Sequence, residues 1–440
     1  MTTTALLESS SSGSRAAREG SYARLSVMNF LNEVAERYPS AISFASGRPA
    51  DGFFELDAWL GGIPRLIEHL AVRDGRDADA VARQIAQYGR TNGFINDLVA
   101  AQLASDEGIH ADAGRIIVTA GCQEALSLCI SALCTERQDV VLSRNPTYIG
   151  VTGAATLAGI DQVVVPGGIS ECAAAVAQTV EMLKRHGKRP RALYLTPSFD
   201  NPTGATMSAE ERIAVLDVCY EHRIVVLEDN PYGMFGFEKA APPNMAELDR
   251  RGVVIYLGTY SKSLCPSVRV GCLVVPQTLF GDEDASRELV EGLGMRKSFA
   301  TVNTSQLNQA LVGGVLLAEG RSLKRMVEPV RNHYWRNRDL LLKCLGEAFS
   351  DDCGVRWNRP DGGFFLSVQL PFAFGQAEVE RCASEFGVIP MPMSYFALDS
   401  TQNASVRMAF SNVSDEQIIH GVDRFSRFVH GRLARRPVGA

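Results

Sequence analysis

A lysine flanked by hydroxyl side chains follows an apolar stretch of the chain and could bind an aldehyde cofactor as an imine. Lys262 lies five residues beyond Leu257, the last residue of that stretch. A lysine held in this way stays in the site and provides a base once a substrate displaces it. Thr259 and Ser261 can donate to a phosphate, and Arg269 can neutralise it with a planar guanidinium. Most lysines are solvated, so the interpretation depends on the neighbouring motifs.

A second segment could cradle a phosphate through its backbone. Thr119-Ala-Gly-Cys122-Gln123 combines a strand end, a glycine turn and a helix start. Free N–H groups and the helix dipole make such a turn a natural anion site. Many turns of α/β proteins have the same pattern, so a purely structural turn is an equal alternative.

A carboxylate and two ring-bonding groups follow two other strand candidates. Asp229 lies at the end of an apolar run, where it can pair with a protonated pyridine nitrogen. That pairing keeps the ring an electron sink for a carbanion at the substrate Cα. Tyr232, three residues later, and Asn201, in Asn-Pro-Thr-Gly, can hydrogen-bond a ring oxygen. Taken singly, each segment could be only a turn.

The order of these motifs resembles that of a known family. Asn-Pro-Thr-Gly, Glu-Asp-x-Pro-Tyr and Thr-x-Ser-Lys-x-x-x-Pro-x-x-Arg-x-Gly begin at Asn201, Glu228 and Thr259. Together they resemble the fold-type I enzymes that depend on pyridoxal 5′-phosphate (PLP), in the class I/II aminotransferase family. From about Ile42 onward the chain is most similar to the branch with 2-aminoadipate and kynurenine aminotransferases and MocR-type proteins. The resemblance implies PLP as cofactor and an aspartate-aminotransferase-like α/β fold.

The resemblance also implies a role for each matching residue. Lys262, Asp229 and Tyr232 take the catalytic positions, with Lys262 as the Schiff-base lysine. The implied cofactor-binding set is Cys122, Gln123, Tyr148, Asn201, Asp229, Tyr232, Thr259, Ser261, Lys262, Arg269 and Tyr88. Tyr148 matches the residue that stacks on the ring, and Tyr88 the tyrosine that reaches the phosphate across a homodimer interface. Arg407, with Asn201, matches the clamp on the substrate α-carboxylate, for which a bidentate guanidinium is well suited.

Several positions depart from the family pattern. Cys122 stands where serine or threonine is commoner, and the loop 388–396 lacks the usual glycine. Arg48 replaces a commonly apolar residue on the segment that covers the substrate. We hypothesise that Arg48 binds an anionic or polar distal group of the substrate. A structural or surface arginine remains the alternative.

Transamination from an L-amino acid to a 2-oxo acid is the predicted reaction. Lys262 would remove the Cα proton, and a 2-oxo acid such as 2-oxoglutarate or pyruvate would complete a ping-pong cycle. Because one fold hosts many chemistries, two alternatives stay open. One is oxidative deamination, decarboxylation or another Cα-carbanion reaction, such as elimination or cyclisation, in natural-product biosynthesis. The other is a PLP-binding protein without turnover. A requirement for a 2-oxo acid acceptor would indicate transamination, whereas oxygen consumption would indicate the oxidative reaction. The seven histidines show no metal-ligand spacing, so we expect no metal.

The elements that must position these residues alternate along the chain. Strand candidates joined by helices predict a mostly parallel sheet covered on both faces, with ligands at the carboxyl ends of the strands. The predicted strands are 116–119, 139–142, 162–165, 192–196, 224–228, 253–257 and 271–275. We expect an N-terminal segment (21–76) that joins a small α+β domain (327–440), and a large PLP-binding domain between them (77–326).

Composition and charge indicate which partners and which cellular compartment to expect. The chain has 440 residues and a formal net charge of −6, which disfavours a nucleic-acid partner. Ten cysteines without a Cys-x-x-Cys pair indicate free thiols in a reducing compartment. The chain start resembles no secretory signal, and its apolar stretches are too short to span a membrane. We expect a cytoplasmic protein without membrane association and with a disordered tail over residues 1–20.

Overall fold

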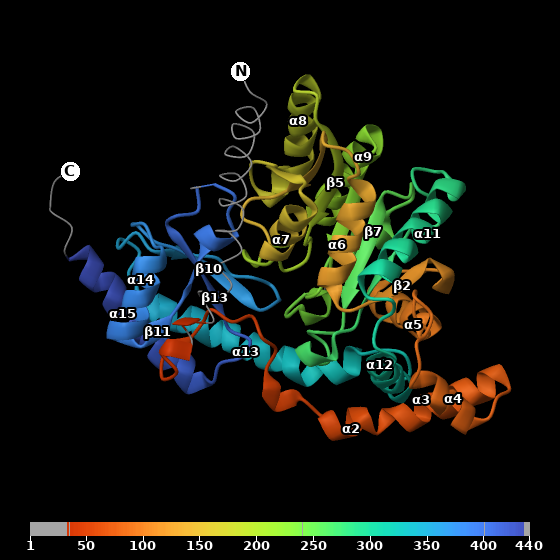
Figure 1. Ribbon diagram of the computed structural model, residues 1–440. Helices are drawn as coiled ribbons and strands as arrows, with labels where there is room; N and C mark the ends of the chain where they lie inside the picture. Colours follow the sequence, from red (N-terminus) through yellow and green to blue (C-terminus); the bar gives the residue numbers. More distant parts are fainter. Residues whose placement is uncertain (1–32, 35, 240, 400, 435–440) are drawn as a thin grey trace, which may run out of the picture.

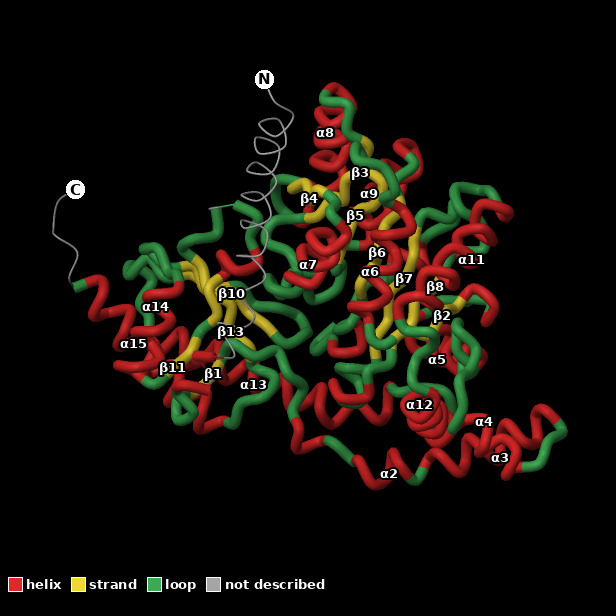
Figure 2. The backbone as a smooth tube through the Cα atoms, viewed as in Figure 1, coloured by secondary structure: helices red, strands yellow, loops and turns green. Residues whose placement is uncertain are grey.

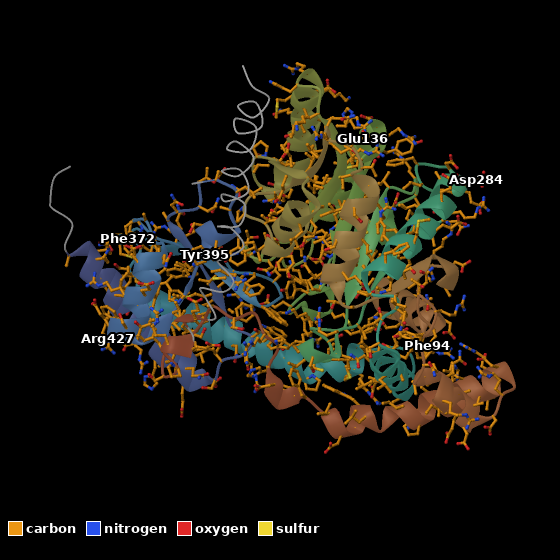
Figure 3. The ribbon with its side chains drawn as sticks, viewed as in Figure 1. Phe94, Glu136, Asp284, Phe372, Tyr395 and Arg427 are labelled. Atoms are coloured by element: carbon orange, nitrogen blue, oxygen red, sulfur yellow. The ribbon has the colours of Figure 1, made fainter. Side chains whose placement is uncertain are left out.

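The computed structural model describes residues 33, 34, 36–239, 241–399 and 401–434. The predicted tail over residues 1–20 lies outside the described residues. Two units, each built around a sheet, lie side by side, and α13 (Lys324–Ala348) extends from one to the other (Figure 1). Glu136 and Asp284 lie on the larger unit, Phe372 and Arg427 on the smaller one (Figure 3).

The larger unit contains a seven-stranded sheet of order β2-β8-β7-β6-β5-β3-β4. The strand β8 is antiparallel to both of its neighbours, β2 and β7, and the other adjacent strands of this sheet pair in parallel. The sheet is therefore mostly parallel, as the sequence predicts. All seven predicted strands are present, with ends shifted by a few residues. They are β2 (Ile116–Thr119), β3 (Asp139–Ser143), β4 (Asp161–Val164), β5 (Arg189–Leu195), β6 (Val225–Asp229), β7 (Val254–Thr259) and β8 (Gly271–Val274).

Helices cover both faces of this sheet (Figure 2). Val141, Tyr194 and Leu227 pack with α6 (Cys122–Leu133), α7 (Ile149–Ala158) and α11 (Glu283–Ala300). Their strand neighbours, including Val140 and Leu193, pack on the other face with α8 (Cys172–Arg185), α9 (Ala209–His222) and α10 (Met245–Leu248). Because successive strand residues point to opposite faces, burial of both faces explains the near-continuous apolar runs in the sequence.

The smaller unit contains the antiparallel sheet β12-β13-β10-β9. Its strands are β9 (Arg356–Trp357), β10 (Phe365–Gln369), β12 (Met391–Pro392) and β13 (Ser405–Ala409). The unit also contains α14 (Gln376–Arg381) and α15 (Asp415–Leu433), and α15 begins with a capping box between Ser414 and Gln417. A separate parallel pair joins β1 (Ile42–Ser43) to β11 (Val388–Ile389).

The segment after β1 contacts the larger unit. It forms α2 (Leu56–Leu60), α3 (Gly62–Asp74), α4 (Ala78–Ile85) and α5 (Asn96–Glu107). The helix α3 packs on α12 (Gln306–Ala318) so closely that a Cβ on Gly314 would lie 2.3 Å from the carbonyl oxygen of Gly62. Residues 42–74 thus contact both units, and the division of the chain at residues 76 and 326 stays a prediction.

All ten cysteines are free thiols. None of the helices within the described ranges is long and apolar enough to cross a bilayer.

Candidate active site

A cavity of about 620 Å³ lies where the carboxyl ends of β5, β6 and β7 face β10 and β13 of the smaller unit. This is the edge at which a parallel sheet is expected to bind ligands. The predicted residues that line it are Arg48, Cys122, Gln123, Tyr148, Asn201, Asp229, Tyr232, Thr259, Ser261, Lys262, Arg269 and Arg407. Tyr88 does not line it, and its side chain is 83% exposed.

Lys262 extends from the loop after β7 toward the segment that follows β1. Its Nζ donates to the carbonyl oxygen of Gly47 at 3.1 Å and lies 5.9 Å from the ring centre of Phe364. The pKa of Lys262 is lowered to about 8, first by burial and then by the cation of Arg407, while Asp229 raises it and Arg269 lowers it to a smaller extent. The lowered pKa increases the fraction of neutral amine near pH 7, and the neutral amine is the form that attacks an aldehyde.

Asp229 is the last residue of β6, and each oxygen of its buried carboxylate accepts a hydrogen bond. The hydroxyl of Tyr194 donates to Oδ2 at 2.6 Å, and the thiol of Cys122 donates to Oδ1 at 3.2 Å. Burial raises the pKa of Asp229, and both donors oppose that rise. An ionised carboxylate here would stabilise a protonated ring nitrogen.

Sequence reasoning missed Tyr194, because its position beside Asp229 follows from the register of β5 against β6, which local sequence does not encode. Tyr194 lies opposite Leu227 on the adjacent strands β5 and β6, and Asp229 follows Leu227 by two residues. Because side chains two apart on a strand share a face, Tyr194 and Asp229 lie on the same side of the sheet.

The loop around Arg269 and the start of α6 form a polar cup. The guanidinium of Arg269 donates to Ser261 Oγ at 3.3 Å and to the carbonyl oxygen of Ala120 at 3.2 Å. The hydroxyl of Thr259 lies 3.1 Å from that of Ser261. Gly121 has φ of +83°, and a Cβ there would lie 2.3 Å from an Arg269 nitrogen, so only glycine allows this approach.

These residues fit PLP. The cup presents a guanidinium, two hydroxyls and the N-terminus of α6, which suits a phosphate monoester. The Asp229 carboxylate suits a ring nitrogen, and the Lys262 amine suits an aldehyde carbon. The side chains of Cys122 and Gln123, which the sequence predicted to bind the cofactor, point away from the cup. The thiol of Cys122 donates to Asp229, and Gln123 Nε2 donates to the carbonyl oxygen of Gly150 at 2.9 Å.

Arg407, on β13, is a buried cation without a carboxylate partner among the described residues. It donates to Asn201 Oδ1 at 2.7 Å and to the carbonyl oxygen of Ala45. The rings of Phe365 and Phe396 lie 4.1 and 4.6 Å from its guanidinium carbon, and its Nε is buried without a partner. Burial lowers the pKa of Arg407 to about 10. A buried guanidinium without a counter-ion is ready to bind an anion.

Comparison with known proteins identifies the family. Residues 68–425 match the family model described as "Aminotransferase class I and II". The chain belongs to this family. The predictions of aminotransferase activity, PLP dependence and fold class are therefore confirmed, and this chain is a PLP-dependent transaminase.

Three relatives show how far the similarity extends. The (S)-3,5-dihydroxyphenylglycine transaminase of Amycolatopsis orientalis is 38% identical over 413 residues, covering 93% of this chain and 92% of the relative. The 2-aminoadipate transaminase of Thermus thermophilus is 32% identical, covering 93% and 95%. The structure of Pyrococcus horikoshii kynurenine aminotransferase with PMP aligns with a TM-score of 0.79 and 26% identity, covering 92% and 94%.

Two aromatic side chains of the aminotransferase complete the cavity wall. Tyr148 precedes α7 and lines the cavity, and Tyr232 is buried with its ring edge-on to Phe365 at 5.7 Å. Burial raises the pKa of Tyr232 well above its usual range, so its hydroxyl stays protonated and can donate.

Arg48 of the aminotransferase lies at the cavity with an exposed side chain. Its backbone carbonyl accepts from Ser411 Oγ at 2.6 Å, which fixes the chain at this point.

Proposed function

We propose that this transaminase moves the amino group of an aromatic L-amino acid to a 2-oxo acid, with both half-reactions in the cavity that contains Lys262. The observation that carries the proposal is the buried Arg407, which has no carboxylate partner within the described part of the chain. It is flanked by Phe365 and Phe396 in the same cavity as Lys262. A guanidinium between two rings suits a carboxylate beside an apolar group.

The identity of the amino donor follows from the remaining wall of the cavity. Leu126, Ile149 and Met391 line it with Phe396, so a side chain bound here meets mostly apolar surface. The relative that is 38% identical is named for an arylglycine. Both observations favour an aromatic donor.

The cofactor-binding roles divide between the two ends of the cavity. Arg269, Ser261 and Thr259 would bind the phosphate of PLP, while Asp229 would pair with the ring nitrogen. Tyr148 would stack on the ring. When bound, PLP supplies an electron sink for the electrons left at the substrate Cα.

The remaining roles concern the proton and the substrate carboxylate. Arg407 and Asn201 would bind the α-carboxylate and orient the Cα–H bond toward Lys262. Lys262 Nζ would then remove the proton from the substrate Cα and return it to the carbon that was the aldehyde carbon of PLP. The lowered pKa of Lys262 permits this proton transfer near neutral pH. Tyr232 would donate a hydrogen bond from its hydroxyl to the ring oxygen and thereby fix the ring orientation.

Among the described residues that line the cavity, Arg48 is the one cation that these roles leave unused. The charged residues of the lining are Arg48, Lys262, Arg269, Arg407 and Asp229. We assign Arg48 to a distal anionic or polar group, and the second carboxylate of a dicarboxylic acceptor such as 2-oxoglutarate matches that charge.

We also propose a cytoplasmic homodimer with shared sites. Tyr88 is exposed in one chain, as a residue that reaches the phosphate of a partner copy would be. Met295 and Phe299 on α11 are exposed apolar side chains that a second copy would cover. Ten free thiols suit a reducing compartment.

Steady-state kinetics of the holoenzyme with aromatic, aliphatic and dicarboxylic donors tests the substrate proposal. We expect the highest kcat/KM with aromatic donors. A preference for a dicarboxylic or small aliphatic donor would overturn it.

A further inference from the structure

The carboxylate of Asp229 is bound by two side chains that the roles above leave unexplained. Tyr194 and Cys122 each donate to a different carboxylate oxygen, at 2.6 and 3.2 Å. Both donors are uncharged. They come from different elements, since Tyr194 lies on β5 and Cys122 is the first residue of α6.

The surroundings hold the stronger donor in place. Tyr194 is 1% exposed, and its hydroxyl lies 3.2 Å from Thr196 Oγ1, which restricts its rotation. Its ring packs in the apolar cluster between the sheet and α6, together with Leu126. A phenol buried in this way has little freedom to turn away from Asp229.

Uncharged donors have a consequence that a cation would not have. A buried carboxylate loses its hydration, so it needs hydrogen bonds to remain ionised. An arginine or lysine would supply them but would also neutralise the charge. Tyr194 and Cys122 stabilise the anion and leave its charge available to a cationic partner. Two donors on two oxygens also fix the carboxylate plane.

We infer that Tyr194 and Cys122 are positioning residues that keep Asp229 ionised and directed at the ring nitrogen of PLP. The inference rests on the role proposed for Asp229. It gives Cys122 a side-chain function at the nitrogen end of the cofactor, apart from any backbone contact with the phosphate.

The test compares Tyr194→Phe, Cys122→Ala and the double variant with the wild type. One readout is the Kd of the apo-protein for PLP, measured by equilibrium dialysis. The other is the ¹⁵N resonance of bound PLP labelled at the ring nitrogen, which reports protonation of that atom directly. Cys122→Ser keeps a donor and serves as the rescue. Cys129→Ala removes a buried thiol from the same helix without touching Asp229 and controls for packing.

We expect each lost donor to raise the Kd for PLP about tenfold, because hydrogen bonds to a charged group are the stronger kind. The ¹⁵N resonance of the double variant should move toward the unprotonated position, while Cys122→Ser and Cys129→Ala stay near wild type. A double variant with the wild-type Kd and resonance overturns the inference. If Asp229→Asn also leaves both unchanged, the proposed role of Asp229 fails instead.

Discussion

Lys262 Nζ donates to the carbonyl oxygen of Gly47 at 3.1 Å, although the two residues are 215 positions apart in the chain. The contact joins the loop after β7 to the segment after β1, so the amine is held over the cavity that contains Arg407. A lysine placed in this way can reach both an aldehyde carbon and the Cα of a substrate whose carboxylate Arg407 binds.

Replacing Lys262 should remove both of its proposed functions. We expect Lys262→Ala to lower kcat by roughly 10²–10⁴-fold, the usual contribution of a positioned proton-transfer group. The variant should also fail to retain the visible absorption band of PLP after gel filtration. Lys184→Ala on the exposed surface of α8 is the matched control and should change neither property. Near-normal turnover in Lys262→Ala would refute the assignment.

The lowered pKa of Lys262 sets a pH dependence for cofactor uptake. Only the neutral amine attacks an aldehyde, so its fraction rises with pH up to the pKa of about 8 and then levels off. The rate of PLP uptake by apo-protein should therefore rise about tenfold per pH unit below that point. Arg407→Met removes a cation that lowers this pKa, so its profile should shift to higher pH. Stopped-flow absorbance measures both profiles, and a wild-type plateau beginning near pH 10 would contradict the explanation.

Arg407 should act on the substrate rather than on the cofactor. We expect Arg407→Met to lower kcat/KM for the amino donor on the order of a hundredfold, because it removes a buried charge-assisted pair. Arg407→Lys keeps the charge without the bidentate geometry, so its kcat/KM for the amino donor should lie between those of the wild type and Arg407→Met. At a pH on the plateau of both uptake profiles, where the pKa of Lys262 no longer matters, the Kd for PLP should stay within about twofold of wild type. Equal losses for PLP and donor would indicate a structural role.

Arg48 should discriminate between acceptors. We expect Arg48→Leu to lower kcat/KM for 2-oxoglutarate about tenfold while leaving pyruvate unchanged, since only the former has a second carboxylate. Arg48→Lys should retain most of the preference. An unchanged ratio between the two acceptors would make Arg48 a surface arginine.

Mixed dimers test whether Tyr88 serves the partner's site. Tyr88→Ala and Lys262→Ala are each expected to be impaired alone. In a random mixture half of the dimers are mixed, and one of their two sites combines intact Lys262 with intact Tyr88. About a quarter of all sites should then recover. No recovery, in mixtures shown to contain mixed dimers, would contradict a shared site.

The sequence predicted the large sheet because its strands are buried on both faces and appear as apolar runs. It also indicated Asn201, Asp229 and Lys262, which follow three of those runs, and all three line one cavity. Local order along the chain carries this information, since parallel strands end at one edge of the sheet.

Other features depend on contacts that local sequence does not encode. The direction of the Cys122 side chain depends on a rotamer, and that of Tyr194 on the register of β5 against β6. The packing of Phe365 and Phe396 around Arg407 depends on how β10, β13 and residues 393–396 of the smaller unit come together. The contact of Gly62 with Gly314 likewise joins segments far apart in the chain.

The most direct test of the central claim is an anaerobic single-turnover experiment on the PLP-loaded protein, with an aromatic amino acid and no acceptor. We expect one equivalent of 2-oxo acid per site and recovery of the cofactor as pyridoxamine phosphate, which a 2-oxo acid then reverses. A cofactor that stays unchanged until oxygen is admitted would contradict transamination and favour oxidative chemistry.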